Sequence, residues 1–148
     1  SINNETIYAV AQKGIFSADV NNPNLVDYNN WLQPEGDLLG NFTSISVIED
    51  AIFTSSSSLL YQLVGVDRLV QRRNYNSNIL NLRSSDQFLT VTLLESALVL
   101  DKDLNLIYEA KASPNYSFQL NTSYAIDDKV YLATNSFGVL TKPFFQAC

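Results

Sequence analysis

Four segments of the chain repeat one pattern: an apolar stretch, a short polar turn and a second apolar stretch. The repeats open at Ile7, Ile52, Leu89 and Val130, which lie 45, 37 and 41 residues apart. Apolar and polar residues alternate, with many Val, Ile, Leu, Thr and Tyr, which predicts strands throughout; no window shows a helical stripe. A recurrence of about 40 residues, each unit all strand, is typical of a β-propeller blade.

The predicted fold is therefore all-β, with about four antiparallel four-stranded sheets whose strands we label a to d. The first and last sheets are expected to be incomplete, and the chain is expected to form part of a larger propeller. The units span approximately 1–40, 41–76, 77–114 and 115–148 of a single domain. The first unit is expected to lack strand a, and Phe144 and Phe145 are expected to begin the last strand. Closed propellers have about four to eight blades, so both a small propeller and part of a larger one fit this length.

Composition excludes several classes of function. A net charge of −6 with nine Lys and Arg argues against a nucleic-acid partner, because neutralising phosphates needs clustered cations. No apolar run approaches the ~20 residues that cross a bilayer. The chain has no histidine, which removes a Ser-His-Asp triad and ordinary zinc sites, and its one cysteine, Cys148, excludes an internal disulfide framework. We expect no catalytic residues, no metal and no cofactor.

Acidic residues recur at the same place in each repeat. They are Glu5, Glu49–Asp50, Asp86 and Asp127–Asp128. Paired carboxylates can do acid–base chemistry, but these fall in the turn between strands a and b, where Asp stabilises turns. The repeat predicts that they lie on separate blades and not in one pocket. The segment 101–105 resembles the start of a calcium loop, but Leu106 and Ala112 stand where glycine and glutamate are required, which indicates a turn between strands c and d.

The first unit carries extra sequence, 21–31, rich in Asn, Pro and Asp. These residues predict a loop, and Leu25, Val26 and Trp31 indicate that it packs back on its blade. The alternative is that Trp31 is an exposed contact residue.

In a propeller, the b–c turns and the d–a connections share one rim, which we call the b–c rim, and ligands usually gather there because loops converge on rigid strands. The a–b and c–d turns form the opposite rim, the a–b rim. Aromatic side chains supply contact area at low entropic cost. The predicted contacts for a protein or glycan partner at the b–c rim are Tyr75, Glu95, Tyr116, Asn135 and Phe137.

The stretch Lys13-Gly14-Ile15-Phe16, followed by Asn24-Leu25-Val26-Asp27-Tyr28-Asn29-Asn30-Trp31, resembles a segment of large surface propellers of Bacteroidetes. These are the PorZ-like proteins of the type 9 secretion apparatus, which are close to the propellers of hybrid two-component sensors. The resemblance covers about twenty residues and implies an exported, non-enzymatic propeller of which this chain is a part. The family offers no catalytic residues to carry over.

Three functions remain open at this point. The leading hypothesis is a non-catalytic binding or scaffold module of an exported bacterial envelope protein, in the periplasm or on the outer-membrane surface and linked to type 9 secretion. The first alternative is the ligand-sensing propeller of a hybrid two-component sensor, and the second is part of a polysaccharide-active enzyme. Exposed strand edges at the terminal blades further predict a homo-oligomer.

Overall fold

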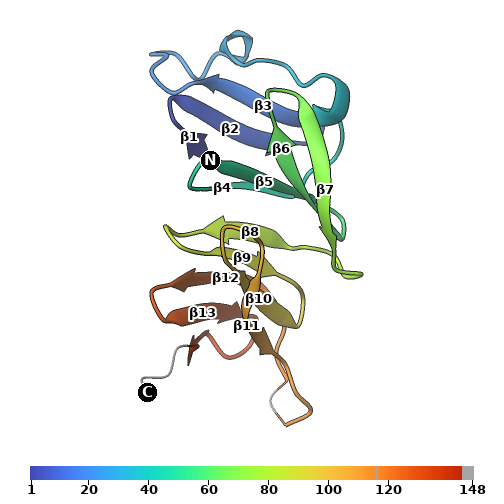
Figure 1. Cartoon of the computed structure of the whole chain (residues 1–148), viewed down its shortest axis with the longest axis vertical. Coiled ribbons are helices and arrows are strands. Elements are labelled where there is room, and N and C mark those ends of the chain that lie inside the picture. Colours follow the sequence, from blue (N-terminus) through green and yellow to red (C-terminus); the bar gives the residue numbers. More distant parts are fainter. Residues whose placement is uncertain (116, 145–148) are drawn as a thin grey trace.

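The computed structural model describes residues 1–115 and 117–144, and it confirms an all-β fold of four separate antiparallel sheets (Figure 1). Sheet 1 contains β1 (Ile2–Asn3), β2 (Thr6–Ala11) and β3 (Gly14–Asp19). Sheet 2 contains β4 (Ser44–Ile48), β5 (Ala51–Ser56), β6 (Leu59–Val64) and β7 (Arg68–Asn74). Sheet 3 contains β8 (Asn81–Ser84), β9 (Leu89–Thr92), β10 (Ser96–Leu100) and β11 (Leu106–Lys111). Sheet 4 contains β12 (Leu120–Ile126), β13 (Lys129–Thr134) and β14 (Val139–Pro143).

Helical structure in the described part of the chain is limited to two short 3₁₀ turns, η1 (Tyr28–Asn30) and η2 (Gly36–Leu38). Both lie in the connection from β3 to β4. No helix within the described residues is long and apolar enough to cross a membrane.

The two terminal sheets are incomplete, as the sequence predicts, with three strands each within the described residues, but the strand that sheet 1 lacks is d and not a. One detail of that prediction is wrong: sheet 1 does have a strand a, because β1 pairs with β2 through Ile2 and Ile7. Two residues are too few for an alternating pattern to be recognised. Phe144 lies outside any strand, and Phe145 falls outside the described residues.

The acidic residues of the repeat occupy tight a–b turns, as expected. The turn between β4 and β5 consists of Glu49 and Asp50, since Ile48 and Ala51 are cross-strand partners. Asn4, Glu49 and Asp127 adopt φ values of 55°, 51° and 57° at the first position of their turns. Positive φ at this position matches the twist of the flanking strands, and the short polar side chains of Asn and Asp tolerate it best.

The core lies between the sheets. Phe53 of sheet 2 packs with Leu89, Val91 and Leu98 of sheet 3 in one buried cluster. A second cluster joins sheets 3 and 4, and its members are Phe88, Ala97, Val99, Ala110, Phe118, Leu120, Ala125, Val130 and Leu132. Sheets 2, 3 and 4 therefore bury apolar side chains against one another, because one sheet alone cannot cover both of its faces.

Polar side chains join the inner strands of adjacent sheets. The Ser46 hydroxyl donates to the Leu82 carbonyl at 3.0 Å, and the Leu82 N–H donates to the Ser44 hydroxyl at 2.9 Å. The hydroxyls of Thr92 and Ser123 form a buried hydrogen bond between sheets 3 and 4. Buried hydroxyl groups with partners cost little to desolvate, and they set the register of one sheet against the next.

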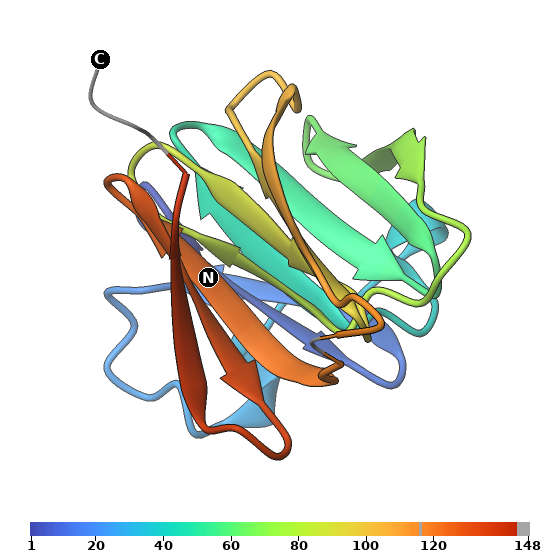
Figure 2. The same ribbon diagram turned by 90° about the horizontal axis from the view of Figure 1, so that it is seen from below.

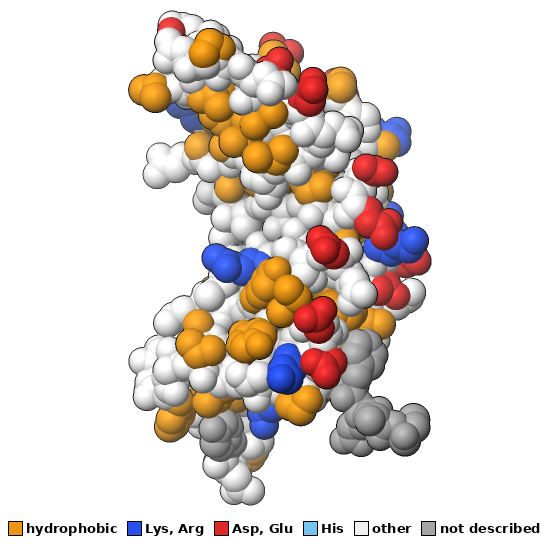
Figure 3. Space-filling model, turned by 90° about the vertical axis from the view of Figure 1, so that its left-hand side faces the viewer, with side chains coloured by type: hydrophobic (Ala, Val, Ile, Leu, Met, Phe, Trp, Pro, Cys, Tyr) orange, Lys and Arg blue, Asp and Glu red, His pale blue; other side chains and the backbone are white. Residues whose placement is uncertain are grey.

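The four sheets form a crescent with sheet 1 at one end and sheet 4 at the other (Figures 1 and 3). Seen from below, sheet 4 lies nearest the viewer, and no other sheet of the described chain covers its near face (Figure 2).

The loop after β3 is compact, as predicted. The indole N–H of Trp31 donates to the Leu25 carbonyl at 2.9 Å, and the Asp27 carboxylate accepts the Asn29 N–H at 2.9 Å. Trp31 is half-buried, but Val26 is 97% exposed, so the expectation that Val26 packs on the blade is wrong. The loop is closed by its polar side chains, which leaves Val26 at the tip without a partner surface.

Gly14 lets this loop approach the sheet. A Cβ at this position would lie 2.1 Å from the Leu38 carbonyl oxygen, and the φ of Gly14 is 145°. Isolated bridges from Gly14 to Leu39 and from Ser17 to Leu32 stand where sheets 2 and 3 have their fourth strand.

Candidate functional site

The b–c rim is held by backbone hydrogen bonds between each b–c turn and the connection to or from the adjacent sheet. The Tyr75 N–H donates to the Ser58 carbonyl at 3.0 Å, and the Ala112 N–H donates to the Glu95 carbonyl at 2.9 Å. At sheet 4, the Asn135 N–H donates to the Gln119 carbonyl at 3.0 Å. The rim is therefore built before any ligand arrives, which lowers the entropic cost of binding.

Glu95 lies in a hollow of about 430 Å³ at this rim. Its exposed carboxylate side chain shares the hollow with Leu94, which is 45% exposed, and with Lys111. The remaining lining residues are Ser77, Leu93, Ser96 and Ala112. One carboxylate, one ammonium group and an exposed leucine provide a polar and apolar contact surface of mixed charge.

Tyr75 belongs to the same rim but turns its side chain inward. The ring packs against the core between sheets 2 and 3, and its hydroxyl is buried without a hydrogen-bond partner among the described residues. Burial raises the pKa of Tyr75 above its usual value, and the charge of Arg73 opposes the shift. Tyr75 does not line the hollow that contains Glu95.

Asn135 and Phe137 lie together in the b–c turn of sheet 4. The Asn135 amide donates to the Gln119 side-chain oxygen at 3.2 Å, and the Phe137 N–H donates to the Thr134 hydroxyl at 2.8 Å. Phe137 is exposed. Both residues lie outside the lining of the Glu95 hollow, and Tyr116 falls outside the described residues. The structure thus does not bring the predicted contacts into one pocket.

Glu95 is the only one of the seven lining residues that was among the predicted contacts, and the most prominent of the others are Leu94 and Lys111. Leu94 is an apolar residue in a two-residue turn, which is itself a signal of exposure. Lys111 is detectable only through strand pairing, because it is the cross-strand partner of Ser96.

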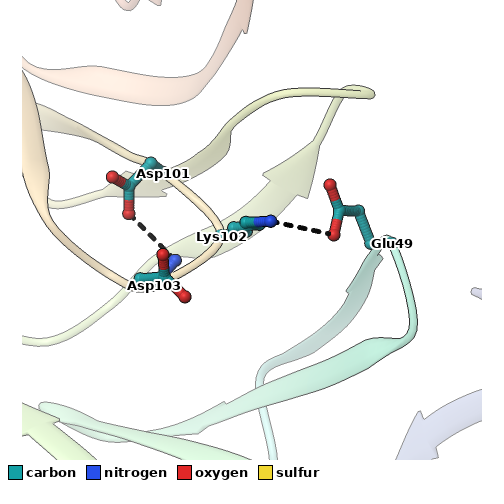
Figure 4. A network of polar contacts seen from close by, with 4 residues as sticks. All are labelled: Glu49, Asp101, Lys102 and Asp103. Carbon is teal, nitrogen blue, oxygen red and sulfur yellow. Dashed lines mark hydrogen bonds and ion pairs between the residues drawn. The ribbon is translucent and has the colours of Figure 1, made fainter.

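The opposite, a–b rim carries a larger hollow of about 480 Å³ between sheets 2 and 3. Its charged and polar lining residues are Glu49, Asp50, Gln62, Arg72, Lys102 and Asp103. Lys102 Nζ lies 3.8 Å from Glu49 Oε2, and both side chains are 58% exposed (Figure 4). An exposed pair of this kind contributes at most about 1 kcal/mol. Acidic side chains recur along this face (Figure 3).

In the turn at 101–105, backbone N–H groups of the turn itself donate hydrogen bonds to the carboxylate of Asp101. Burial alone would raise the pKa of Asp101, but hydrogen bonds from the Asn105 N–H, the Asn105 amide and the Asp103 N–H outweigh it. Together with the charge of Lys102 they hold the pKa of Asp101 below its usual value. Among the residues that the structure describes, no three His, Cys, Asp or Glu side chains form a group that could hold a metal ion.

One prediction about the acidic turns is wrong. Asp86 and Asp127 belong to different sheets, yet both line a hollow of about 300 Å³ with Gln87, Tyr124 and Ile126. The a–b turns of adjacent sheets are neighbours on one rim, so equivalent positions in successive repeats lie near each other.

No family model matches the chain, and no curated protein matches it. Solved structures do. The WD40 β-propeller domain of Doa1 superposes with a TM-score of 0.70 and 13% identity, over 97% of this chain and 50% of that one. The fold is that of β-propeller blades.

Two further structures agree with this fold. The computationally designed protein Ika4 matches with a TM-score of 0.69 and 13% identity, over 97% of this chain and 88% of that one. The extracellular domain of a putative hybrid two-component system from B. thetaiotaomicron matches with a TM-score of 0.62 and 15% identity. That match covers 98% of this chain but 22% of the other, and the present chain spans half the length of the Doa1 chain.

Proposed function

We propose that this chain is a single partial or small β-propeller of four units that serves as a non-catalytic binding or scaffold module of an exported bacterial envelope protein. It binds a protein or glycan partner at the b–c rim. The observation that carries the proposal is the hollow of about 430 Å³ in which Leu94, Glu95 and Lys111 converge on a rim already held by backbone hydrogen bonds. Loops on a rigid scaffold are where binding residues concentrate.

The side-chain inventory supports binding over catalysis. The chain lacks histidine, and no described cluster offers a metal site. Glu95 has Lys111, Leu94 and small residues around it in the hollow, with no second carboxylate in the lining. Paired carboxylates are the usual requirement for glycoside hydrolysis. A polysaccharide-active enzyme therefore needs residues from outside this hollow.

The proposed location, the periplasm or the outer-membrane surface, is supported by the similarity to an extracellular domain from B. thetaiotaomicron. The link to type 9 secretion rests on the resemblance of residues 13–16 and 24–31 to PorZ-like propellers. Deleting the gene in its host and measuring export of type 9 cargo tests that link, and unchanged export would refute it.

A second candidate function is favoured by the same solved structure. As the sensing propeller of a hybrid two-component system, the chain would bind an oligosaccharide at the rim. A transmembrane segment and a kinase domain downstream in the full-length gene product favour the sensor, whereas a C-terminal sorting domain favours the envelope scaffold.

The binding test uses charge variants of the hollow. Glu95→Gln and Lys111→Gln are each expected to weaken binding at least about tenfold, the effect of losing one charged contact of about 1.4 kcal/mol. Glu109→Gln and Lys102→Gln are matched controls, because both residues are exposed and lie outside the hollow, with Lys102 on the opposite rim. Equal affinity of all four variants and the unmodified chain would remove the assignment of the site.

A further inference from the structure

The two ends of the crescent expose faces that every internal sheet buries. The second residue of each repeat turns its side chain toward the following sheet. In sheet 2 this residue is Phe53, which is 1% exposed and packs against sheet 3. Thr90, at the same position of sheet 3, is buried and bonds sheet 4. Tyr131, the equivalent residue of sheet 4, is 39% exposed because no described sheet follows it.

Apolar side chains continue along that face of sheet 4, beside the polar Thr141 and the exposed Lys129 at its end. Ala133 and Val139 are cross-strand partners, and Tyr131 pairs with Thr141. Because residues directly opposite each other share a face, these four side chains form one surface, and Val139 is 66% exposed. We call this surface the trailing face.

Sheet 1 exposes the opposite kind of face. The first residue of each repeat faces the preceding sheet, and Leu89 and Val130 are completely buried there. The equivalent Ile7 is only half-buried, and its cross-strand partner Ile2 is exposed. Ala9 and its cross-strand partner Phe16 continue this surface. The ring of Tyr28, from the loop after β3, contacts the ring of Phe16 at its border. We call it the leading face.

The leading and trailing faces are the two halves of one repeating interface. Sheets 2 and 3, and sheets 3 and 4, join the trailing side of one sheet to the leading side of the next through buried apolar clusters. The apolar side chains of this interface are left exposed at both ends of the crescent. Exposed apolar faces of this kind mark interaction surfaces. A head-to-tail contact between two such faces continues the interface that the fold already uses.

We infer that a second copy of this chain covers both faces, so that two crescents close one ring of eight sheets. A two-fold axis brings each trailing face onto the partner's leading face and leaves no end open, which is the condition for a closed assembly. Eight sheets lie within the range of closed propellers. Two copies also supply the length of the Doa1 propeller chain, of which one copy covers 50%. The inference does not depend on the proposed ligand site.

Sedimentation velocity on the purified chain tests the inference. The unmodified chain is expected to sediment as a dimer, and Ala9→Arg and Tyr131→Arg are each expected to sediment as monomers. Val66→Arg, on an 84% exposed turn residue outside both faces, is the matched control and should remain a dimer. Circular dichroism verifies that each variant folds, and Ile2→Arg and Val139→Arg replace any variant that does not.

Mixing the two monomeric variants identifies the head-to-tail geometry. One variant keeps an intact trailing face and the other an intact leading face, so their equimolar mixture should recover a dimer that neither forms alone. A monomeric unmodified chain at its highest soluble concentration would overturn the inference. A dimer that survives both substitutions, an unrecovered mixture or an assembly larger than a dimer would also overturn it.

Discussion

The hydroxyl of Thr90 on β9 accepts a hydrogen bond from the backbone N–H of Ala125 on β12, at 3.1 Å and across the boundary between sheets 3 and 4. Both residues are buried, and β12 is the innermost strand of its sheet, so this N–H points away from its own ladder. The contact shows how the sheets are joined: the free edge of each inner strand finds its partners on the preceding sheet.

Replacing Thr90 with Val is expected to lower the free energy of unfolding by about 1–3 kcal/mol, because the Ala125 N–H is left buried without an acceptor. Urea denaturation measures the change. Thr90→Ser keeps the hydroxyl and should recover most of the loss. A Val variant as stable as the unmodified chain would contradict the role given to this hydrogen bond.

Leu132 is completely buried between sheets 3 and 4. Leu132→Ala is expected to cost about 2–5 kcal/mol, since it removes buried methyl groups and leaves a cavity. Leu106→Ala, on the exposed face of β11, is the control and should change the free energy of unfolding by less than about 0.5 kcal/mol. Similar costs at both positions in thermal or urea unfolding would contradict the packing described for sheet 4.

Tyr75→Phe is expected to raise the free energy of unfolding by about 1 kcal/mol, because it deletes a buried hydroxyl that has no hydrogen-bond partner. The pH dependence should change with it. A folded-state pKa above the unfolded value means that stability is full below pH ~10 and falls as the pH rises through the folded pKa. Urea titrations of both proteins across that range measure the difference, and a destabilised Phe variant would indicate a partner for the hydroxyl.

The carboxyl group of Asp101 should have a pKa below that of an unstructured aspartate, which lies near 3.9. Because the folded pKa is depressed, the stability it contributes is present above the unfolded pKa and is lost as the pH falls through the folded one. Carbon NMR titration of the carboxyl group measures the pKa directly. Asn105→Ala, which removes the amide donor, should move the midpoint upward, and an unchanged midpoint would assign the shift to the backbone donors and the charge of Lys102.

Much of the fold was predictable because its signals are local. The equivalence of Ile7, Ile52, Leu89 and Val130 agrees with the strand pairing, in which each residue belongs to or begins the second strand of its sheet. Tight a–b turns such as Glu49–Asp50 were recognisable from residue type alone. The two-residue β1 was missed, because pairing with β2 and not its own pattern makes it a strand.

The candidate site was less predictable. Rim residues such as Glu95 and Phe137 follow from counting strands, but the inward turn of Tyr75 depends on space between sheets 2 and 3. That space is set by side chains far away in sequence, including Leu89 and Leu98. The same holds for Asp86 and Asp127, which share a hollow only because adjacent sheets place their turns side by side.

The sequence alone determined the number of repeating units and the positions of their turns, since alternation and turn chemistry act over a few residues. Only the tertiary structure decided which faces are buried. Thr90 and Tyr131 hold the same place in the repeat, yet one is buried and the other exposed, because a sheet face is covered only when another sheet follows it.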